Sequence, residues 1–347
     1  MENGRSIAAR TLIQAGTYAG VILAVLLVLK AAQVFLVVFG GVLFAILFHG
    51  IAQWVSRKTA MPEKWSLFLS LTAILVLSGI GMWLIAPDVS DQASELADRI
   101  PRALRQLREN LLQYEWVNRL MQQQDRIRSM LPDGSNAVGV AAGFFSSTFG
   151  ALGNLLIALA LGLFISINPA IYINGLLYLV PPTKRARAHE VLQATGNTLA
   201  SWLIAKLVEM LVIGVLTTLG LWLLGIDLAL VLGVIAALLS FIPNIGPVVA
   251  LLPAALIALI SGPDTLIYVV LLYTGIQTFE SYVLTPFLQQ RLVDLPPALV
   301  VSVQVLFGVL AGVLGVILAT PLTAAAMVMI RMWYVEDLLG DQSVNNA

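Results

Sequence analysis

Long apolar runs, separated by short polar breaks, dominate the chain and predict its fold. A helix needs roughly 20 mostly apolar residues to cross about 30 Å of hydrocarbon. Runs of this kind predict full membrane spans over residues 11–29, 34–54, 66–85, 144–167, 203–224 and 265–287. Only Lys30, Ala31, Ala32 and Gln33 separate the first two runs, which predicts a helical hairpin there. We therefore expect an all-α fold, a polytopic transmembrane helical bundle.

Two further apolar regions, residues 228–260 and 298–332, are too long for one straight span and too short for two. The first is broken by the sequence SFIPNIGP at 240–247, and the second by Gly312, Gly315 and Pro321. A proline removes an amide donor and clashes with the preceding helical turn. We predict a re-entrant or broken helical hairpin in each region, which gives about eight membrane segments; a full span in either region is the alternative.

The sizeable polar segment at residues 88–136 divides the chain into three parts. It separates a three-span membrane region at 1–87 from a core at 137–347 that contains both hairpins. A shorter helix is expected at 118–130, and Pro101 suits the first turn of a helix. Apolar residues recur at helical spacing at Ile100, Leu104, Leu107 and Leu111. We expect an extracytoplasmic amphipathic segment whose apolar stripe packs on the membrane domain, on lipid or on a neighbouring subunit.

Lysine and arginine positions predict the orientation, since short cytoplasmic loops are enriched in these residues. Arg5 and Arg10 place the N-terminus in the cytoplasm. Two crossings later, Arg57 and Lys58 lie on the same side, and Lys184 follows after two more. This pattern keeps the segment 88–136 outside the cell.

Composition excludes several classes of protein. Hydrophobic residues make up 59% and charged residues 11% of the 347 positions, whereas soluble proteins carry about a quarter charged residues. The lipid bilayer is therefore an expected partner, and a formal net charge of +0 disfavours nucleic-acid binding. The sequence has no cysteine, no nucleotide-phosphate loop and no zinc or nucleophile motif. We expect no enzyme activity, no cofactor, no metal and no ATP-driven step.

One face of the 265–287 run carries the first candidate site. Glu280 lies near its centre, with Gln277 one turn earlier and Tyr273 on the same side. Ionisable side chains at membrane depth are costly and mark ion or substrate pathways, so Glu280 is interpreted as a protonatable carboxylate or a cation ligand. A neutral acid that joins two helices is the alternative. Lys206 and Glu209 are secondary candidates, because an ion pair near the headgroups needs no functional explanation.

The turn formed by Pro243, Asn244, Gly246 and Pro247 is the second candidate site. Non-helical backbone at membrane depth persists only where it is buried in protein or lines a cavity, and its free carbonyls bind cations or polar solutes. Gln304 contributes a further polar side chain, either to this pathway or to an interhelical hydrogen bond. A tight turn that merely reaches the far surface is the alternative for the whole motif.

The same motifs carry a family resemblance. They are LGLWLLG at 219–225, FIPNIGP at 241–247, Leu252-Pro253, Gln277, Glu280, Pro286, Leu306-Phe307-Gly308, Gly312, Gly315 and Pro321-Leu322. Together with the layout of spans, they resemble the autoinducer-2 exporter family. The resemblance implies a homo-oligomeric permease of the bacterial cytoplasmic (inner) membrane. It implies export of the quorum-sensing signal autoinducer-2, or exchange of sodium or lithium for protons. The chain departs from a common family pattern at Ile204-Ala205-Lys206, where many relatives carry a basic residue, a glycine and a glutamine.

These observations together predict a secondary transporter with residues 137–347 as its transport core. It is expected to export a small polar solute such as autoinducer-2, coupled to a proton or cation gradient. A sodium (lithium)/proton antiporter is one alternative. An oligomeric channel or membrane scaffold without active transport is the other.

Overall fold

The computed structural model describes residues 2–59, 61–112, 153–289 and 296–341. Within these residues the secondary structure is helical, without strands. Four helices are long and apolar enough to cross a membrane, and the number rises to six if each of two bent helix pairs is one span. The predicted all-α, polytopic transmembrane helical bundle is therefore confirmed.

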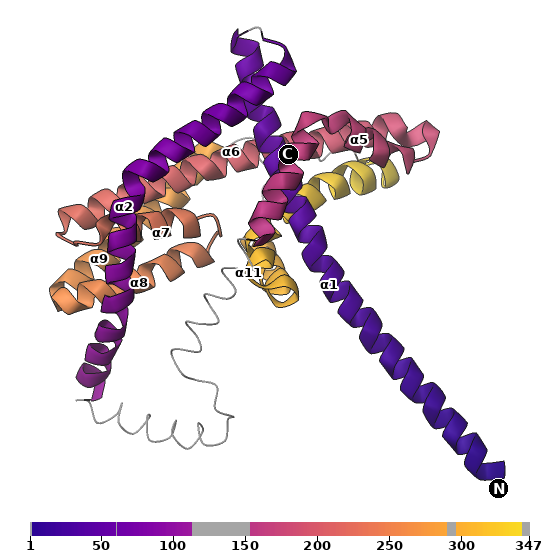
Figure 1. Cartoon of the computed structure of the whole chain (residues 1–347), viewed down its shortest axis with the longest axis horizontal. Coiled ribbons are helices and arrows are strands. Elements are labelled where there is room, and N and C mark those ends of the chain that lie inside the picture. Colours follow the sequence, from indigo (N-terminus) through magenta and orange to yellow (C-terminus); the bar gives the residue numbers. More distant parts are fainter. Residues whose placement is uncertain (1, 60, 113–152, 290–295, 342–347) are drawn as a thin grey trace.

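The N-terminal part consists of two long helices, α1 (Glu2–Thr59) and α2 (Glu63–Leu112). In Figure 1, α1 reaches far beyond the other helices, with the N-terminus at its distant end. The hairpin turn predicted at residues 30–33 is absent, and α1 continues through it. The physical reason is that lysine, alanine and glutamine are good helix formers, and residues 30–33 include no glycine or proline.

The third predicted span and the described part of the polar segment, up to Leu112, form one helix rather than two. Pro101 does not begin a helix, since α2 includes both Pro87 and Pro101, and its two halves bend by 45° between Gly81 and Trp83. The second half packs against the first hairpin through Leu96 and Ile100. The side chains of Leu104, Leu107 and Leu111, and the helix expected at 118–130, lie outside the described residues.

The middle of the chain leads into the longest helix of the core. The helix Gly153–Ile167 bends by 88° into α5 (Pro169–Tyr178). A short 3₁₀ turn, η1 (Pro182–Lys184), precedes α6 (Arg185–Leu223). Helix α6 packs against α1, α7 (Ala229–Leu239), α9 (Pro263–Phe279) and α11 (Pro297–Met329), which makes it the central element of the core.

The first predicted hairpin is present as α7 (Ala229–Leu239) and α8 (Ile245–Ser261), joined by the turn at 240–244. Small residues allow α7 to approach α6 closely. A Cβ atom at Gly214 would lie 2.8 Å from the Cβ of Ala237, and one at Gly233 would lie 1.9 Å from the hydroxyl of Thr218. Glycine is therefore required at both positions of this contact.

The second predicted hairpin lies within α11 (Pro297–Met329), whose backbone leaves the helical conformation at Gly312, with φ 63° and ψ −144°. A Cβ atom at Gly315 would lie 2.0 Å from the carbonyl oxygen of Phe307. Residues eight apart in a straight helix are about 12 Å apart along its axis, so the two halves of α11 fold back on each other. Pro321 lies inside the second half and does not break it.

Two stretches of wider, π-helical backbone complete the fold. The first, η2 (Glu280–Leu284), continues α9 (Pro263–Phe279) into α10 (Thr285–Gln289). The second, η3 (Ile330–Leu338), continues α11. Wider turns of this kind are rare and occur frequently at functional sites, and Glu280 is the first residue of η2.

Candidate functional site

A cluster of three buried ionisable side chains lies between α6 and η2. Lys206 and Glu209, on successive turns of α6, are 4% and 2% exposed, and the Lys206 ammonium forms an ion pair with the Glu209 carboxylate. Glu280, which is 8% exposed, lies close enough to Glu209 and Lys206 to interact with both electrostatically. Among the described side chains, these three are the buried members of the Asp, Glu, Lys and Arg set.

The cluster contains two carboxyl groups and one ammonium. With a proton on one carboxyl group it would hold one ammonium, one carboxylate and one carboxylic acid, and its net charge would be zero. Burying an uncompensated charge is far more costly than burying a neutral set. Charge balance therefore favours one bound proton on the pair formed by Glu209 and Glu280.

Gln277 and Tyr273 do not join Glu280 in one group. The Gln277 side-chain amide nitrogen donates to the hydroxyl of Ser281 within η2 at 3.4 Å, and its amide oxygen is buried without a hydrogen-bond partner. Tyr273 packs in the apolar cluster formed with α7 and α8, and its hydroxyl is also buried without a partner. The predicted face therefore divides between an ionic site and an apolar core.

The turn of the first hairpin is held in a strained conformation. Asn244 has φ 66° and ψ −45°, and the Ile245 amide donates to the Pro243 carbonyl at 2.8 Å. This is a three-residue γ-turn with positive φ, a rare and strained form. Gly246 is required next to it, because a Cβ atom there would lie 1.9 Å from the Leu239 carbonyl oxygen.

Gln304 of α11 connects the second hairpin to this turn. Its amide nitrogen donates to the Pro243 carbonyl at 3.2 Å. The side chain is fully buried, and its amide oxygen has no partner. In contrast, Asn244 is exposed, while Pro243 and Pro247 are half-buried. The predicted turn residues thus include one polar contact between the hairpins and one side chain at the surface.

An aromatic contact places the turn beside the ionic cluster. The ring of Phe241, at the start of the turn, meets the ring of Trp202 edge-to-face, with centroids 5.6 Å apart. Trp202 precedes Lys206 by four residues on α6, and residues four apart lie on one face of a helix. The two candidate sites are therefore neighbours on α6. The sequence predicts only a secondary role for Lys206 and Glu209, because spacing within α6 does not reveal that η2 covers them.

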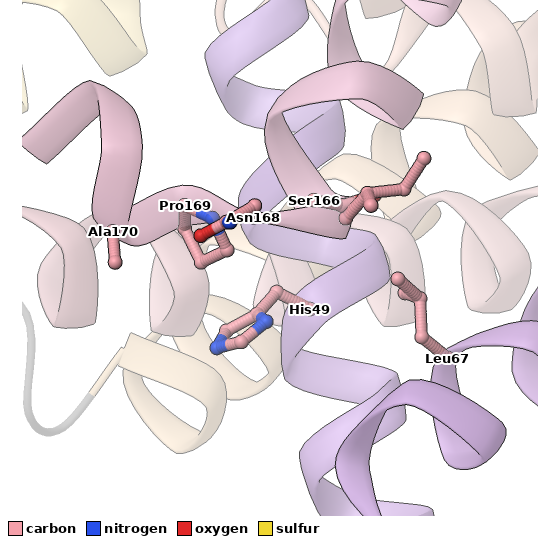
Figure 2. Close-up of a pocket in the computed structure, with 7 residues that line it drawn as sticks. His49, Leu67, Ser166, Asn168, Pro169 and Ala170 are labelled. Carbon is pink, nitrogen blue, oxygen red and sulfur yellow. The ribbon is translucent and has the colours of Figure 1, made fainter.

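A separate cavity lies away from this cluster. It has a volume of about 350 Å³ and is lined by His49, Leu67, Ser166, Ile167, Asn168, Pro169 and Ala170. Figure 2 shows the His49 ring close to Asn168 and Pro169, at the elbow before α5. No described group of three or more histidine, cysteine, aspartate or glutamate residues has the arrangement of a metal site.

The similarity to known proteins extends over most of the chain, including both hairpins. The family described as AI-2E family transporter matches residues 16–334. YueF of Bacillus subtilis (strain 168) is 21% identical over 299 residues, which is 82% of this chain and 79% of that protein. YhhT of Escherichia coli (strain K12) is 22% identical over 317 residues, which is 86% of this chain and 84% of that protein.

A third relative matches a shorter part of the chain with higher sequence identity. YrrI of Bacillus subtilis (strain 168) is 32% identical over 152 residues, which is 44% of this chain and 43% of that protein. All three relatives are named as transport proteins. The family match includes every residue of the two candidate sites. This chain is therefore a multi-pass membrane protein that belongs to the AI-2E transporter family.

Proposed function

We propose that this protein is a secondary transporter in which Lys206, Glu209 and Glu280 bind the coupling proton or cation. The observation that carries the proposal is the burial of all three side chains in one cluster beside a broken helical hairpin. Ionisable groups at membrane depth mark ion pathways and proton relays. Discontinuous helices are where transporters of several folds place their binding sites.

Charge balance gives the cluster a coupling chemistry. Lys206 neutralises one carboxylate, and a proton neutralises the other. Loss of that proton leaves a net charge of minus one in a buried site, which is unfavourable unless one cation takes its place. The cluster can therefore hold one proton or one monovalent cation. Mutual exclusion of the two is the requirement for exchange.

The turn at Pro243–Pro247 and Gln304 are proposed to contact the transported solute. The Gln304 amide oxygen is a buried hydrogen-bond acceptor without a partner at the meeting point of the two hairpins. Buried acceptors of this kind favour a small polar solute that donates hydrogen bonds. Autoinducer-2 is a solute of that class. Export across the bacterial cytoplasmic membrane by a homo-oligomer, with the N-terminus in the cytoplasm, belongs to the same proposal.

Sodium (lithium)/proton antiport is the second candidate, and the charge of the cluster favours it. Antiport needs only the ionic cluster, whereas solute export needs the turn and Gln304 as well. In the third candidate, an oligomeric channel or scaffold, Glu280 would have only a structural role. The three functions differ in what crosses the membrane and in whether Glu280 is needed.

Proteoliposome flux distinguishes these functions. Vesicles containing the wild-type protein, Glu280→Gln or no protein are given a proton gradient, and autoinducer-2 uptake is measured. Sodium pulses to the same vesicles are followed with an internal pH dye. We expect gradient-dependent autoinducer-2 flux that falls to the level of empty vesicles in Glu280→Gln, because the amide cannot exchange the proton.

Asp264→Asn is the matched control, since Asp264 is an exposed acid in the first turn of α9, the helix that leads to Glu280. It should transport like the wild type. Absence of autoinducer-2 flux together with sodium-dependent pH changes would replace the exporter by the antiporter. Ion leakage that Glu280→Gln leaves unchanged would favour the channel or scaffold.

A further inference from the structure

One face of the second half of α2 lies against the first hairpin. Gln92, Leu96, Arg99 and Ala103 recur at spacings of four, three and four residues, so they form one stripe along the helix. Leu96 and Ala103 are buried, and Leu96 packs in the apolar cluster built from α7, α8 and α9. Polar and apolar side chains therefore alternate along the stripe.

Gln92 supplies a missing helix cap. The first amides of a helix have no partner within it, and the N-cap residue of α7, Leu228, has no side chain that can accept a hydrogen bond. The Val231 amide, the third in α7, instead donates to the Gln92 side-chain oxygen at 3.1 Å. The start of α7 is thus stabilised by a residue 139 positions earlier in the chain.

Arg99 makes the second polar link. Its guanidinium lies 3.6 Å from the Asp227 carboxylate, in the loop that precedes α7, and it also pairs with Glu95 on its own helix. The Asp227 side chain is 74% exposed, so water competes for this ion pair and the link is weak. Both polar links therefore join α2 to the same end of the first hairpin.

We propose that the stripe formed by Gln92, Leu96, Arg99 and Ala103 is a releasable clamp on the first hairpin, with Gln92 and Arg99 as its polar fasteners. The clamp holds the start of α7 in place while it is closed. Movement of the hairpin away from α6 during transport requires its release, and this part of the proposal rests on the proposed function. One of the two fasteners is solvent-exposed, so release chiefly requires that the buried side chains of Leu96 and Ala103 leave their packed positions.

Hydrogen–deuterium exchange of the full-length protein in nanodiscs tests the clamp without any transport assay. Gln92→Leu removes the acceptor and keeps the size of the side chain. We expect amides near the start of α7, around Val231, to exchange about fivefold to tenfold faster, the effect of losing a helix cap. Gln92→Glu keeps an acceptor oxygen and should restore slow exchange.

Arg99→Gln should also accelerate exchange in the 226–231 region. Arg102→Gln is its matched control, because it removes the same charge from α2 while the Arg102 guanidinium contacts only the backbone of Asp98 in the described structure. Unchanged exchange in both Gln92→Leu and Arg99→Gln would overturn the clamp. Acceleration by Arg102→Gln equal to that of Arg99→Gln would overturn the role of the Arg99 contact.

A cross-link tests release. The chain has no cysteine, so Gln92→Cys with Val231→Cys can be bridged by a reducible bifunctional thiol reagent. Autoinducer-2 or sodium-driven flux should stop in the bridged protein and return on reduction, while each single variant treated alike should stay active. Undiminished flux through the bridged protein would overturn release. Lack of any flux in the wild type would contradict the proposed function instead, and exchange near Val231 would still decide the clamp.

Discussion

At the residue scale, the cluster of Lys206, Glu209 and Glu280 buries three ionisable side chains, and such burial costs free energy unless the charges are paired. Each side chain is nearly inaccessible to solvent, and the position of each is useful only because of the other two. An ammonium without its carboxylate, or a carboxylate without its ammonium, would remain as a single charge in an apolar medium. The effects of substitutions in the cluster on stability should therefore be coupled, so that a second substitution can offset the loss caused by the first.

Lys206→Met should destabilise the protein, because it leaves two acids without their cation. Breaking a buried ion pair from one side costs about 3–5 kcal/mol. The double substitution Lys206→Met with Glu209→Gln removes both charges and should recover most of that loss. Denaturant unfolding in detergent measures both values. A double variant less stable than Lys206→Met alone would contradict a charge-paired cluster.

Gly246→Ala should destabilise the first hairpin. The added Cβ would lie 1.9 Å from the Leu239 carbonyl oxygen, and relief of such a clash by backbone movement costs about 1–3 kcal/mol or more. Gly275→Ala is the matched control, since no atom lies within 4 Å of its added Cβ. It should be neutral or stabilising, because alanine favours helix. The melting temperatures of the two variants give the comparison.

Part of this site could be predicted from the sequence. Glu280 is identifiable because it stands in an otherwise apolar run, and the Pro243–Pro247 turn because its prolines and glycine break a helix. The burial of Lys206 and Glu209 is different. It depends on η2 lying over α6, and no spacing within α6 specifies which of its faces another helix covers. The packing of the Tyr273 ring in the apolar cluster with α7 and α8 is likewise not specified by spacing within its own helix.

At the scale of single elements, the two hairpins turn in different ways. The first uses a strained γ-turn at Asn244, and the second uses a positive-φ glycine at Gly312. Backbone strain in a non-glycine residue persists only where surrounding contacts determine the conformation. Here the Pro243 carbonyl receives two hydrogen bonds, from the Ile245 amide and from Gln304. The turn of one hairpin is thus stabilised by a side chain of the other.

Asn244→Ala should destabilise the protein by about 1 kcal/mol or more, because alanine tolerates positive φ poorly. Asn244→Gly should be neutral or stabilising at the same position, since glycine adopts positive φ readily. The difference between the two variants isolates the backbone effect, because both remove the amide side chain. Equal stability of the two in a denaturant titration would contradict a strained turn.

The helix boundaries show which sequence signals are sufficient to predict where a helix ends or turns. Proline and glycine identified both hairpins because both residues act through local backbone geometry. The same rule was wrong for α2, which continues through Pro101, since packing of Leu96 and Ile100 on the hairpin favours the continuous helix. The turn expected at residues 30–33 was inferred from run length alone, without a helix-breaking residue to form it.

At the scale of the whole molecule, a polar network joins the beginning of α6 to the end of the chain. Arg187 donates two hydrogen bonds of 3.1 Å to the Asp337 carboxylate and one of 2.8 Å to Glu336, both in η3. It also pairs with Glu190 at 3.0 Å. Residues 150 positions apart are therefore held together by one guanidinium, which fixes the second hairpin relative to α6.

Arg187→Ala should release η3 from α6. We expect faster proteolytic cleavage between residues 330 and 341, with little change elsewhere, because the contacts are made by one side chain. Arg185→Ala is the control, as the described contacts of Arg185 are with Val180 and Tyr178. High salt should accelerate cleavage of the wild type in the same direction, since these partly exposed ion pairs are screened. Equal cleavage rates for both variants would contradict the link.

The contact between Gln92 and Val231 also sets an order of events during synthesis. A ribosome that adds about 5–20 residues per second needs roughly 7–28 s to cover the 139 positions between them. Throughout that interval the nascent α2 exists without the hairpin that covers its stripe. The bilayer surface, a neighbouring chain or an insertion factor is expected to shield Leu96 until α7 emerges.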